Sequence, residues 1–541
     1  MKMLTKLMKL TAVVAVVLGV VACGGDKKSG AQLATKDNMI PDNAVVAVKV
    51  MPEQLWEKAL GDPDSQARQL LNMMKVGLSM SAGELGELGD DISSIMKDAS
   101  SLGLDLTAPV VISLSGDLEK IETEEASVEM CMVALLSDKD AFVSLLDATL
   151  DFAEDNAGFE VKKSTDAGFA HYELYAEEGA YFDLAVTSES VIFRFSYDTL
   201  SESKNLKKSM SELFADGGKK AGVEEFYASK ADLAVWGDFA GLMNTVMPAL
   251  EMADAAEVQM LKEYLPMYED ASMMVTLNFE DGATVLEMMM KGSEAMIATA
   301  QKYNAAASDT YFKYLPATSV FVANFAIKDF PGLIDEICQS NPEYKETFEY
   351  LKESMGIDEE FLAGFPGLIT IALDGYGIDR KEVPGFVAFM ECSETVWDFA
   401  AGFLGEVAEQ VGTNQYNVND MFYVAYEEPA IIIVEKETLA RSFDGTASSF
   451  ANVPLASEIS KGGFVINVDA IPGYLLDSLA DELEMDFTGD DLLEYLSSVV
   501  VTSSDDHMSA KVILNMNDKE HNLLEKVVEL FVDQVAGQLA F

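Results

Sequence analysis

Histidines are the first place to look for acid–base chemistry, and the chain has only three: His171, His507 and His521. It has no HExxH motif and no pair of histidines at metal-binding spacing, so a zinc hydrolase of the usual design is excluded. A Ser-His-Asp triad would have to use one of the three, and no GxSxG motif accompanies them. We expect His171, beside Tyr172 in a strand-like run, to be a surface or half-buried side chain rather than a base.

A serine–lysine motif is a second candidate for nucleophilic chemistry. Residues Ser201 to Lys204 match the SxxK pattern of serine acyl enzymes. The companion KTG motif is absent, and a chain rich in Ser and Lys contains SxxK by chance. We therefore interpret Ser201 as a helix N-cap.

Carboxylate pairs for glycoside hydrolysis or calcium binding are a third candidate, because the chain has 92 Asp and Glu residues. Nothing in the sequence marks any two of them as a pair. The clusters Asp490-Asp491 and Asp505-Asp506 lack the alternating ligands and central glycine of an EF-hand loop, so we interpret them as solvated turns. Phosphate loops and dinucleotide fingerprints are also absent. The sequence predicts no catalytic residue, no metal and no cofactor.

Three tryptophans, Trp56, Trp236 and Trp397, fall at strand–helix transitions. They are candidates for sugar stacking, but aromatic residues among Leu and Phe at helical spacing are typical of a core, which is our prediction. The 29 methionines are dispersed and lack neighbouring histidines, so packing is expected of them rather than copper binding.

The thiol of Cys23 has a clearer use. Residues 1–22 carry three lysines before a short apolar run, about half the roughly 20 residues that a membrane-spanning helix needs. The run ends in Val-Val-Ala before Cys23 and resembles the bacterial lipobox, whose cysteine receives a diacylglycerol. We predict a lipoprotein signal peptide at 1–22, lipidation of Cys23 and a flexible tether at 23–38.

The residues after Cys23 bear on the location of the anchor. Gly24 stands where enterobacterial lipoproteins retained in the inner membrane have Asp, and this resemblance favours the outer membrane. Asp26, Lys27 and Lys28 only loosely resemble the charged export tags of Bacteroidetes surface lipoproteins. The choice between the periplasmic face and the cell surface stays open.

Charge excludes one class of partner. The chain has 37 basic and 92 acidic residues, a net charge of −55. Without the three lysines of the signal, 34 basic residues remain and the charge is −58. Such a surface repels phosphate backbones and anionic headgroups. We therefore expect no nucleic acid partner, and a membrane contact through the lipid on Cys23 alone.

Length and cysteine content give two further limits. A chain of 541 residues with 49% hydrophobic residues predicts two or more folded domains. Cys131, Cys338 and Cys392 remain besides Cys23, so at most one disulfide can form, and its pair stays open. Cys131 and Cys392 lie in or at the end of apolar runs and are expected to be buried.

The chain also repeats itself. Four segment pairs recur in the same order in both halves. They are Ile40–Leu55 with Leu315–Phe330, Val133–Leu146 with Val387–Ala400, Asp232–Val246 with Gly463–Asp477, and Ser272–Thr276 with Ser498–Thr502. The offset falls from 275 to 226, as expected if the second copy has shorter loops. This predicts an internal duplication that pairs Pro41 with Pro316 and Asp238 with Asp469.

Local patterns predict strands followed by helices within each copy. Val45–Val50 is a β-branched run followed by Pro52, which suits a first helical turn. Residues 171–196 predict consecutive antiparallel strands, and Asp281-Gly282 predicts a hairpin turn. The predicted fold class is α+β, with two tandem copies of an antiparallel sheet and helices packed on one face. The copies are expected at 39–300 and 310–541, joined near 291–310.

The lipobox, the short tether and the "IPDNAVVAV" strand with its return in the second half resemble a group of large Bacteroidetes envelope lipoproteins classified only as a domain of unknown function. This resemblance implies no activity, and the lipobox cysteine is the one functional residue that it transfers. Our leading hypothesis is a non-enzymatic lipoprotein that binds or scaffolds an envelope protein through a groove between the copies. The alternatives are a carrier of a small or hydrophobic ligand, and a hydrolase whose site is not visible in the sequence.

Overall fold

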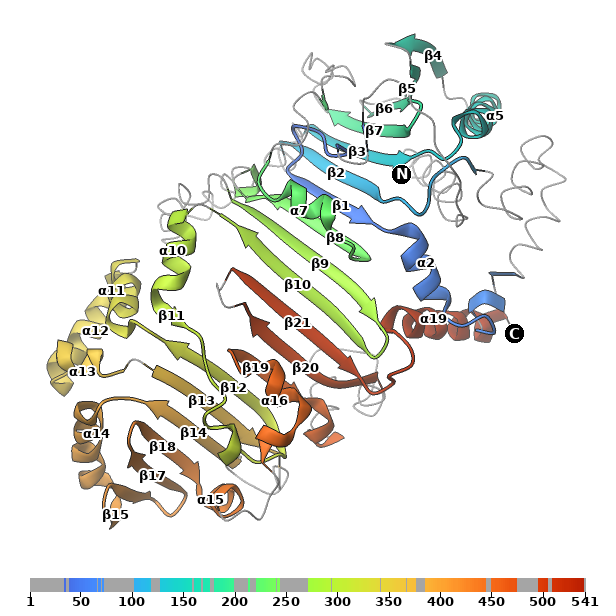
Figure 1. Ribbon diagram of the computed structural model, residues 1–541. Coiled ribbons are helices and arrows are strands. Elements are labelled where there is room, and N and C mark those ends of the chain that lie inside the picture. Colours follow the sequence, from blue (N-terminus) through green and yellow to red (C-terminus); the bar gives the residue numbers. More distant parts are fainter. Residues whose placement is uncertain are drawn as a thin grey trace. The chain divides into compact units, whose positions relative to one another are not determined.

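The structure is a computed structural model (Figure 1). It describes residues 34–35, 38–65, 67–69, 71–72, 102–117, 127–157, 160–166, 169–175, 180–198, 213–214, 220–239, 241–243, 271–292, 294–340, 342–365, 367–375, 385–443, 449–473, 495–504 and 508–539.

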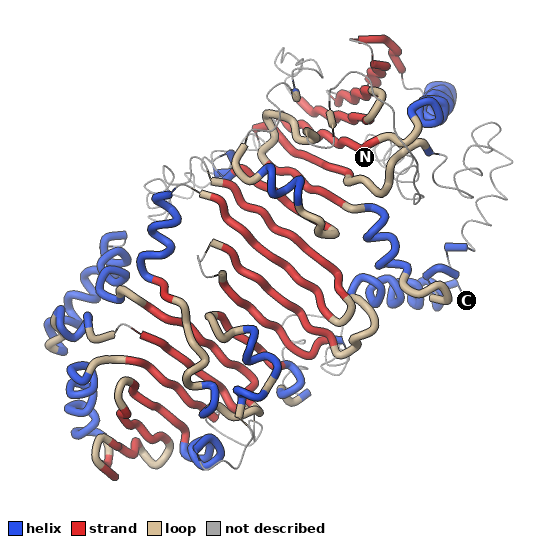
Figure 2. Tube along the Cα trace, in the orientation of Figure 1, coloured by secondary structure: helices blue, strands red, loops and turns tan. Residues whose placement is uncertain are grey.

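The dominant element is one antiparallel sheet of 21 strands (Figure 2). The expected fold class, two tandem α+β copies with helices packed on one face, is therefore wrong: helices are few beside this sheet. The error has a physical reason. Local patterns identify strands, whereas the number of sheets depends on long-range pairing between them. The hairpin at Asp281 and Gly282 is confirmed, with Gly282 at φ 74° between β9 (Ser272–Glu280) and β10 (Ala283–Lys291).

The chain forms two compact units. Unit 1 comprises residues 1–279, 290–292 and 521–541, and unit 2 comprises residues 280–289 and 293–520. The described strands of unit 1 pair in the order β9-β8-β1-β2-β3-β7-β6-β5-β4. Their bounds are β1 Val46–Val50, β2 Val110–Asp117, β3 Ser127–Leu135, β4 Glu160–Asp166, β5 Phe169–Tyr175, β6 Ala180–Val186, β7 Ser190–Asp198 and β8 Leu233–Asp238.

Both faces of the unit 1 sheet carry a core. On one face, Cys131, Val133 and Ile192 belong to a cluster that includes the fully buried Trp236. The other face packs under helix α5 (Lys139–Ala157) through a second cluster that contains Phe142. Because strand side chains alternate between faces, neighbouring residues of one strand serve both clusters.

The C-terminal helix α19 (Leu523–Leu539) packs on helix α2 (Pro52–Leu60) within unit 1. Val532 joins Leu60 in a small apolar cluster, and Trp56 packs against it. The Asn522 side chain donates a hydrogen bond of 3.2 Å to the carbonyl of Lys58. Helix α19 therefore belongs to unit 1, although it lies far from α2 along the sequence.

Unit 2 has the strand order β10-β21-β20-β19-β12-β13-β14-β18-β17-β16-β15, and β11 (Asn304–Ala305) also pairs with β12. The remaining bounds are β12 Ser319–Ile327, β13 Gly367–Asp374, β14 Gly385–Glu391, β15 Glu409–Gly412, β16 Gln415–Val418, β17 Phe422–Glu427, β18 Ala430–Glu435, β19 Gly463–Asn467, β20 Leu496–Ser503 and β21 Ser509–Met516.

The helices of unit 2 follow its strands. They are α10 Glu294–Tyr303, α11 Phe330–Ser340, α12 Pro342–Met355, α13 Glu359–Ala363, α14 Glu394–Val407, α15 Lys436–Phe443 and α16 Pro454–Glu458. Trp397 of α14 is buried and stacks on Tyr426 of β17, with ring centroids 5.5 Å apart. This contact fixes α14 over the last strands of the unit.

The two units share an order of strand pairing. In unit 1 the strands pair in the order β8-β1-β2-β3-β7-β6-β5-β4. The order β19-β12-β13-β14-β18-β17-β16-β15 of unit 2 is the same when β1–β8 and β12–β19 are matched in chain order. A buried polar residue occupies the same place in both: Lys49 of β1 and Asn324 of β12. Lys49 Nζ donates to carbonyls at the end of helix α7 (Val223–Ala228), and Asn324 Nδ2 donates to the carbonyl of Ile459 just after α16. With Lys49 matched to Asn324, the strand pairings assign to each strand residue of unit 1 its counterpart in unit 2.

Candidate functional site

The segment before β1 is held firmly against unit 1. The backbone N–H groups of Met39 and Ile40 donate to the hydroxyl of Tyr227 at 2.7 and 2.9 Å. Ser190 Oγ donates to the carbonyl of Ala34 at 3.0 Å, and Ala34 is buried. Packing in the described part of the chain therefore begins at Ala34, inside the stretch 23–38 that we expected to be a flexible tether.

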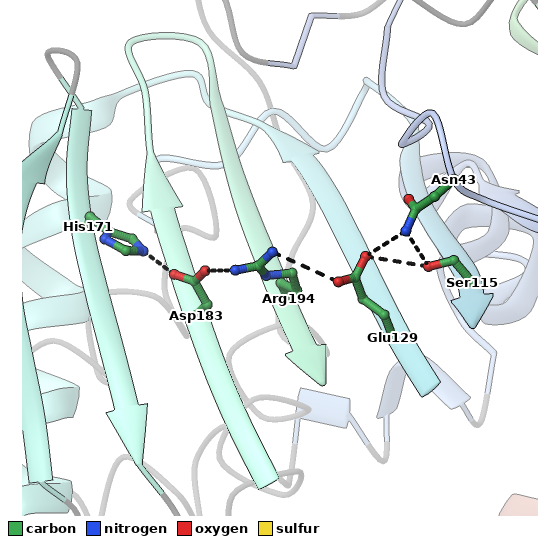
Figure 3. A network of polar contacts seen from close by, with 6 residues as sticks. All are labelled: Asn43, Ser115, Glu129, His171, Asp183 and Arg194. Carbon is green, nitrogen blue, oxygen red and sulfur yellow. Dashed lines mark hydrogen bonds and ion pairs between the residues drawn. The ribbon is translucent and has the colours of Figure 1, made fainter. Parts of the chain in front are cut away.

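A row of polar side chains begins at this segment and crosses the sheet (Figure 3). Asn43 Nδ2 donates to Ser115 Oγ of β2 and to Glu129 Oε1 of β3, both at 3.2 Å. Glu129 Oε2 lies 3.8 Å from Arg194 Nη1 of β7. Arg194 Nη2 in turn lies 2.5 Å from Asp183 Oδ2 of β6. Asp183 Oδ1 contacts Nε2 of His171 on β5.

The charges of this row are withdrawn from water. Asp183, Arg194 and Glu129 are only 1%, 3% and 6% exposed, whereas the His171 side chain is 15% exposed. Removing charged groups from water costs several kcal/mol per ion unless close partners compensate. The sheet register supplies those partners by placing Arg194 opposite Asp183.

Cys131 lies within the same part of the sheet, opposite Arg194 and Ser113. Burial raises the pKa of its thiol strongly, and the nearby Glu129 carboxylate adds to that shift. The thiolate is the reactive form of cysteine, so this buried thiol is chemically inert.

The row ends in the residue types of a catalytic triad. Ser164 of β4 pairs with His171 of β5, and its Oγ lies 3.4 Å from His171 Nδ1. With Asp183 on the other ring nitrogen, the order Ser164–His171–Asp183 forms, which we did not predict from the sequence. The expected strand run at 171–196 contains His171 and Asp183, which successive hairpins place side by side, whereas Ser164 lies before that run.

Unit 2 shows that the fold does not require this polar row. At the positions where unit 1 has Cys131, Arg194, Asp183 and Glu129, the register of unit 2 places Val387, Val434, Tyr423 and Gly385. Only the first link has a counterpart: Thr318 Oγ1 donates to Asp374 Oδ1 at 2.7 Å, where unit 1 has Asn43 and Ser115. The ion pairs are a property of unit 1 and not of the strand arrangement.

The other residues that the sequence analysis singled out lie in several different places. Cys23, His507, the motif Ser201–Lys204 and the clusters Asp490-Asp491 and Asp505-Asp506 lie outside the described residues. His521 precedes α19, far along the chain from the row of His171. Trp236 and Trp397 are buried, which confirms their core role, and Trp56 packs against the α2–α19 cluster.

The structure also bears on the cysteines, on metal binding and on membrane-spanning helices. Cys131 and Cys392 are buried, as predicted, and both they and Cys338 are free thiols. Within the described ranges, no three His, Cys, Asp or Glu side chains are grouped so that they could hold a metal ion. No helix among the described residues combines the length and apolarity needed to cross a membrane.

A different kind of site lies on the surface of unit 2. Phe403 and Val407 of α14 are 62% and 52% exposed, and Val411 of the neighbouring β15 is 48% exposed. Phe399, one turn before Phe403, packs on Phe361 at 4.7 Å between ring centroids. The apolar side of α14 thus starts in the core and continues onto the surface. We call Phe403, Val407 and Val411 the α14 patch.

Comparisons with known proteins add a family. No curated protein matches the chain. The solved structure described as "Structure of crystal form IV of TP0453" is similar over 52% of this chain and 90% of that chain, with 13% identity and a TM-score of 0.23. Residues 36–437, which are most of the chain, match the model of one protein family. The protein therefore belongs to the family described as Domain of unknown function (DUF4836).

Proposed function

We propose that this chain is a lipid-anchored, non-enzymatic protein of the bacterial envelope that binds or scaffolds another envelope protein. The observation that carries the binding role is the α14 patch. Large apolar side chains exposed together on a surface mark interaction sites, because covering them releases ordered water. Phe403 and Val407 have no such cover within the described chain.

The anchor rests on the sequence before Cys23 and on the packed segment that begins at Ala34. Lipidation of Cys23 would attach the chain to the outer membrane, on its periplasmic face or at the cell surface, as in the Bacteroidetes lipoproteins that the sequence resembles. Only a short stretch separates Cys23 from packed chain, so unit 1 would be held near the bilayer.

An internal duplication is part of this proposal. It is supported by the equal order of strand pairing in the two units and by the match of Lys49 with Asn324. A duplicated chain offers one copy for packing near the anchor and the other for contact with a partner.

Co-purification of the lipidated full chain from its native envelope tests the proposal. One protein partner at constant stoichiometry is expected. The Cys23→Ser variant should move from the detergent phase to the aqueous phase on phase partitioning. Absence of any partner, or detergent-phase behaviour of Cys23→Ser, would contradict the binding role or the anchor respectively.

The Ser164–His171–Asp183 order favours a second candidate, a hydrolase. In that function Ser164 Oγ would attack an ester carbonyl and pass its proton to His171 Nδ1, while Asp183 orients the ring. Two features weigh against it: the 3.4 Å contact is long, and Asp183 is shared with Arg194. Ester hydrolysis by the full chain that disappears in both Ser164→Ala and His171→Gln would establish this candidate.

A further inference from the structure

We propose that one face of the sheet in each unit binds the acyl chain of a lipid. This binding goes beyond the proposed contact with an envelope protein and uses other residues. Three observations carry it. The face is apolar yet only partly buried, it is alike in both units, and there is open space over one of its glycines.

In unit 2, strands β12, β13, β19 and β20 bury one face and leave the other partly exposed. Val322, Val465 and Val500 on the buried face are at most 1% exposed. The residues that alternate with such positions are all apolar, and none of them belongs to a buried cluster of the described chain. We call them the open face of unit 2: Phe321, Ala323, Phe325, Ile369, Ile371, Leu373, Phe464, Ile466, Val499 and Val501.

Unit 1 has a corresponding open face. With Lys49 matched to Asn324, strands β1, β2, β8 and β9 correspond to β12, β13, β19 and β20. The residues on the same side of these strands are again apolar, partly exposed and outside the buried clusters: Val46, Val48, Val50, Ile112, Leu114, Leu233, Val235, Met273, Val275 and Leu277. The ion pairs of the polar row occur in unit 1 only, whereas the open face is common to both units.

The open face carries no charge. None of its residues in either unit has a charged or polar side chain, although 24% of the whole chain is Asp, Glu, Lys or Arg. An antiparallel sheet with one solvated face commonly alternates apolar and polar residues. The backbone groups of β1, β8, β12 and β19 are already paired with strands on both sides. An occupant of this face therefore gains apolar contact and no hydrogen bond.

Hydrocarbon is the occupant that this chemistry fits. A protein–protein interface has about one hydrogen bond per 100–200 Å², and the open face offers none. A second copy of the chain would bring the same net charge of −55 and repel the first. An acyl chain has neither charge nor polar groups, and each CH₂ group that it buries favours binding.

The space over the open face of unit 1 is free at Gly237 of β8. Gly237 lies between Val46 of β1 and Met273 of β9, and a Cβ built on it meets no atom of the described chain within 4 Å. The corresponding position of unit 2 holds Ile466, opposite Phe321. Glycine inside a strand often marks a place where a ligand comes close. We place the acyl chain of unit 1 over this point.

The test measures binding of straight-chain alcohols of increasing length to the full chain with Cys23→Ser, which has no lipid of its own. The alcohols displace cis-parinaric acid, a polyene fatty acid whose fluorescence rises in apolar surroundings. Binding should saturate, and affinity should rise about fourfold with each added CH₂ group. This dependence on chain length needs no substituted face, so it tests the inference even if a further variant fails to fold.

Two substitutions in the same Cys23→Ser chain address the two units. Gly237→Phe fills the open space of unit 1, and Phe325→Glu places a charge on the open face of unit 2 at a side chain that is 41% exposed. Each should remove one of two binding sites, and the double variant both. The matched controls are Gly402→Phe and Val411→Glu on α14 and β15, where the Gly402 position is equally open and Val411 is 48% exposed. The controls should keep both sites.

Unsaturable binding, or affinity that does not change with chain length, would overturn the inference. Undiminished binding by the double variant, or equal losses in the controls, would overturn it too, because the ligand would lie elsewhere. Attachment to vesicles without uptake of single alcohols would indicate contact with a bilayer instead, and a dimer that Phe325→Glu dissociates would indicate a second copy. Both results would contradict acyl-chain binding, and co-purification of a protein partner tests the proposed function separately.

Discussion

Asp183 and Arg194 form an ion pair of 2.5 Å between neighbouring strands, and the corresponding strands of unit 2 hold Tyr423 and Val434 instead. The same arrangement of strands therefore accepts either a buried ion pair or an apolar pair. Replacing a buried ion pair by packed side chains is often neutral or stabilising, whereas removing one partner is costly.

Arg194→Val alone should lower the free energy of unfolding by about 3–5 kcal/mol, because it leaves the buried Asp183 and Glu129 carboxylates without the Arg194 guanidinium. Adding Asp183→Tyr and Glu129→Gln removes both charges and should recover most of that loss. Urea unfolding with hydrogen exchange of β6 and β7 measures both variants. An equal loss in the single and triple variants would contradict this explanation, because it would show that the unpaired carboxylates are not the cause of the loss.

Lys49 should make the stability of unit 1 depend on pH. Burial lowers its pKa to about 8, while three backbone carbonyls accept hydrogen bonds from its ammonium group. Between pH 8 and its ordinary pKa near 10.5, the unfolded chain binds the proton that the folded chain has lost. Stability from this residue is therefore least below pH 8 and rises with pH through that window.

From pH 7.5 to 9.5 the gain should be about 2 kcal/mol, since one proton changes stability by about 1.4 kcal/mol per pH unit. Lys49→Met should be less stable at every pH, because it leaves carbonyls unpaired, and should lack this rise. Urea unfolding of both proteins across the pH range measures the difference. Parallel pH profiles would contradict the role assigned to Lys49.

The sequence predicted local features better than the assembly of the sheet. It located the Asp281-Gly282 turn and the buried Trp236 and Trp397, because turn chemistry and hydrophobic spacing are local. It assigned two sheets where there is one, and it missed the polar row. That row joins strands β2, β3, β5, β6 and β7, whose neighbours are set by pairing and not by spacing along the chain.

The predicted repeat pairs also show that short sequence patterns do not determine strand pairing. The sequence pair Ser272 and Ser498 agrees with the strand register. Val275 and Val501, each three residues further on, occupy matching places opposite β8 and β19. Val133, by contrast, matches Phe389 by register, two residues from the Val387 of the sequence pair. Sequence similarity of short apolar runs cannot distinguish shifts of two residues, because a shift of two keeps every side chain on its own face.

Cysteine reactivity should follow burial. Burial raises the pKa of both Cys131 and Cys392, whereas Cys338 of α11 is partly exposed. Iodoacetamide should therefore alkylate Cys338 in the native Cys23→Ser chain and leave the other two unmodified until urea unfolds the protein. Peptide mass spectrometry after timed labelling measures this. Native labelling of Cys131 at the rate of Cys338 would show that its part of the sheet opens readily.

Gly405→Ala should stabilise the free protein while leaving its structure unchanged. The new methyl group meets no atom within 4 Å, and alanine restricts the unfolded chain more than glycine does. The free energy of unfolding should rise by roughly 0.5–1 kcal/mol. Gly367→Ala is the contrasting variant, because its φ is 153° and its Cβ would lie 2.5 Å from the Glu391 side chain. That variant should lose stability, and urea unfolding of both proteins would reveal the opposite signs.

The distance between the proposed lipid and unit 1 gives the last prediction. Ala34 is buried and hydrogen-bonded to Ser190, and ten residues lie between it and Cys23, so the chain makes eleven residue-to-residue steps from one to the other. Fully extended, that stretch spans at most about 40 Å. With the full chain on vesicles, energy transfer from a dye at Glu189 to headgroup acceptors should report a separation within that limit. Inserting a long Gly-Ser linker after Gly30 should weaken the transfer, whereas the same linker after Phe541 should not. Unchanged transfer with the first linker would show that the segment from Cys23 to Ala34 does not set the position of unit 1.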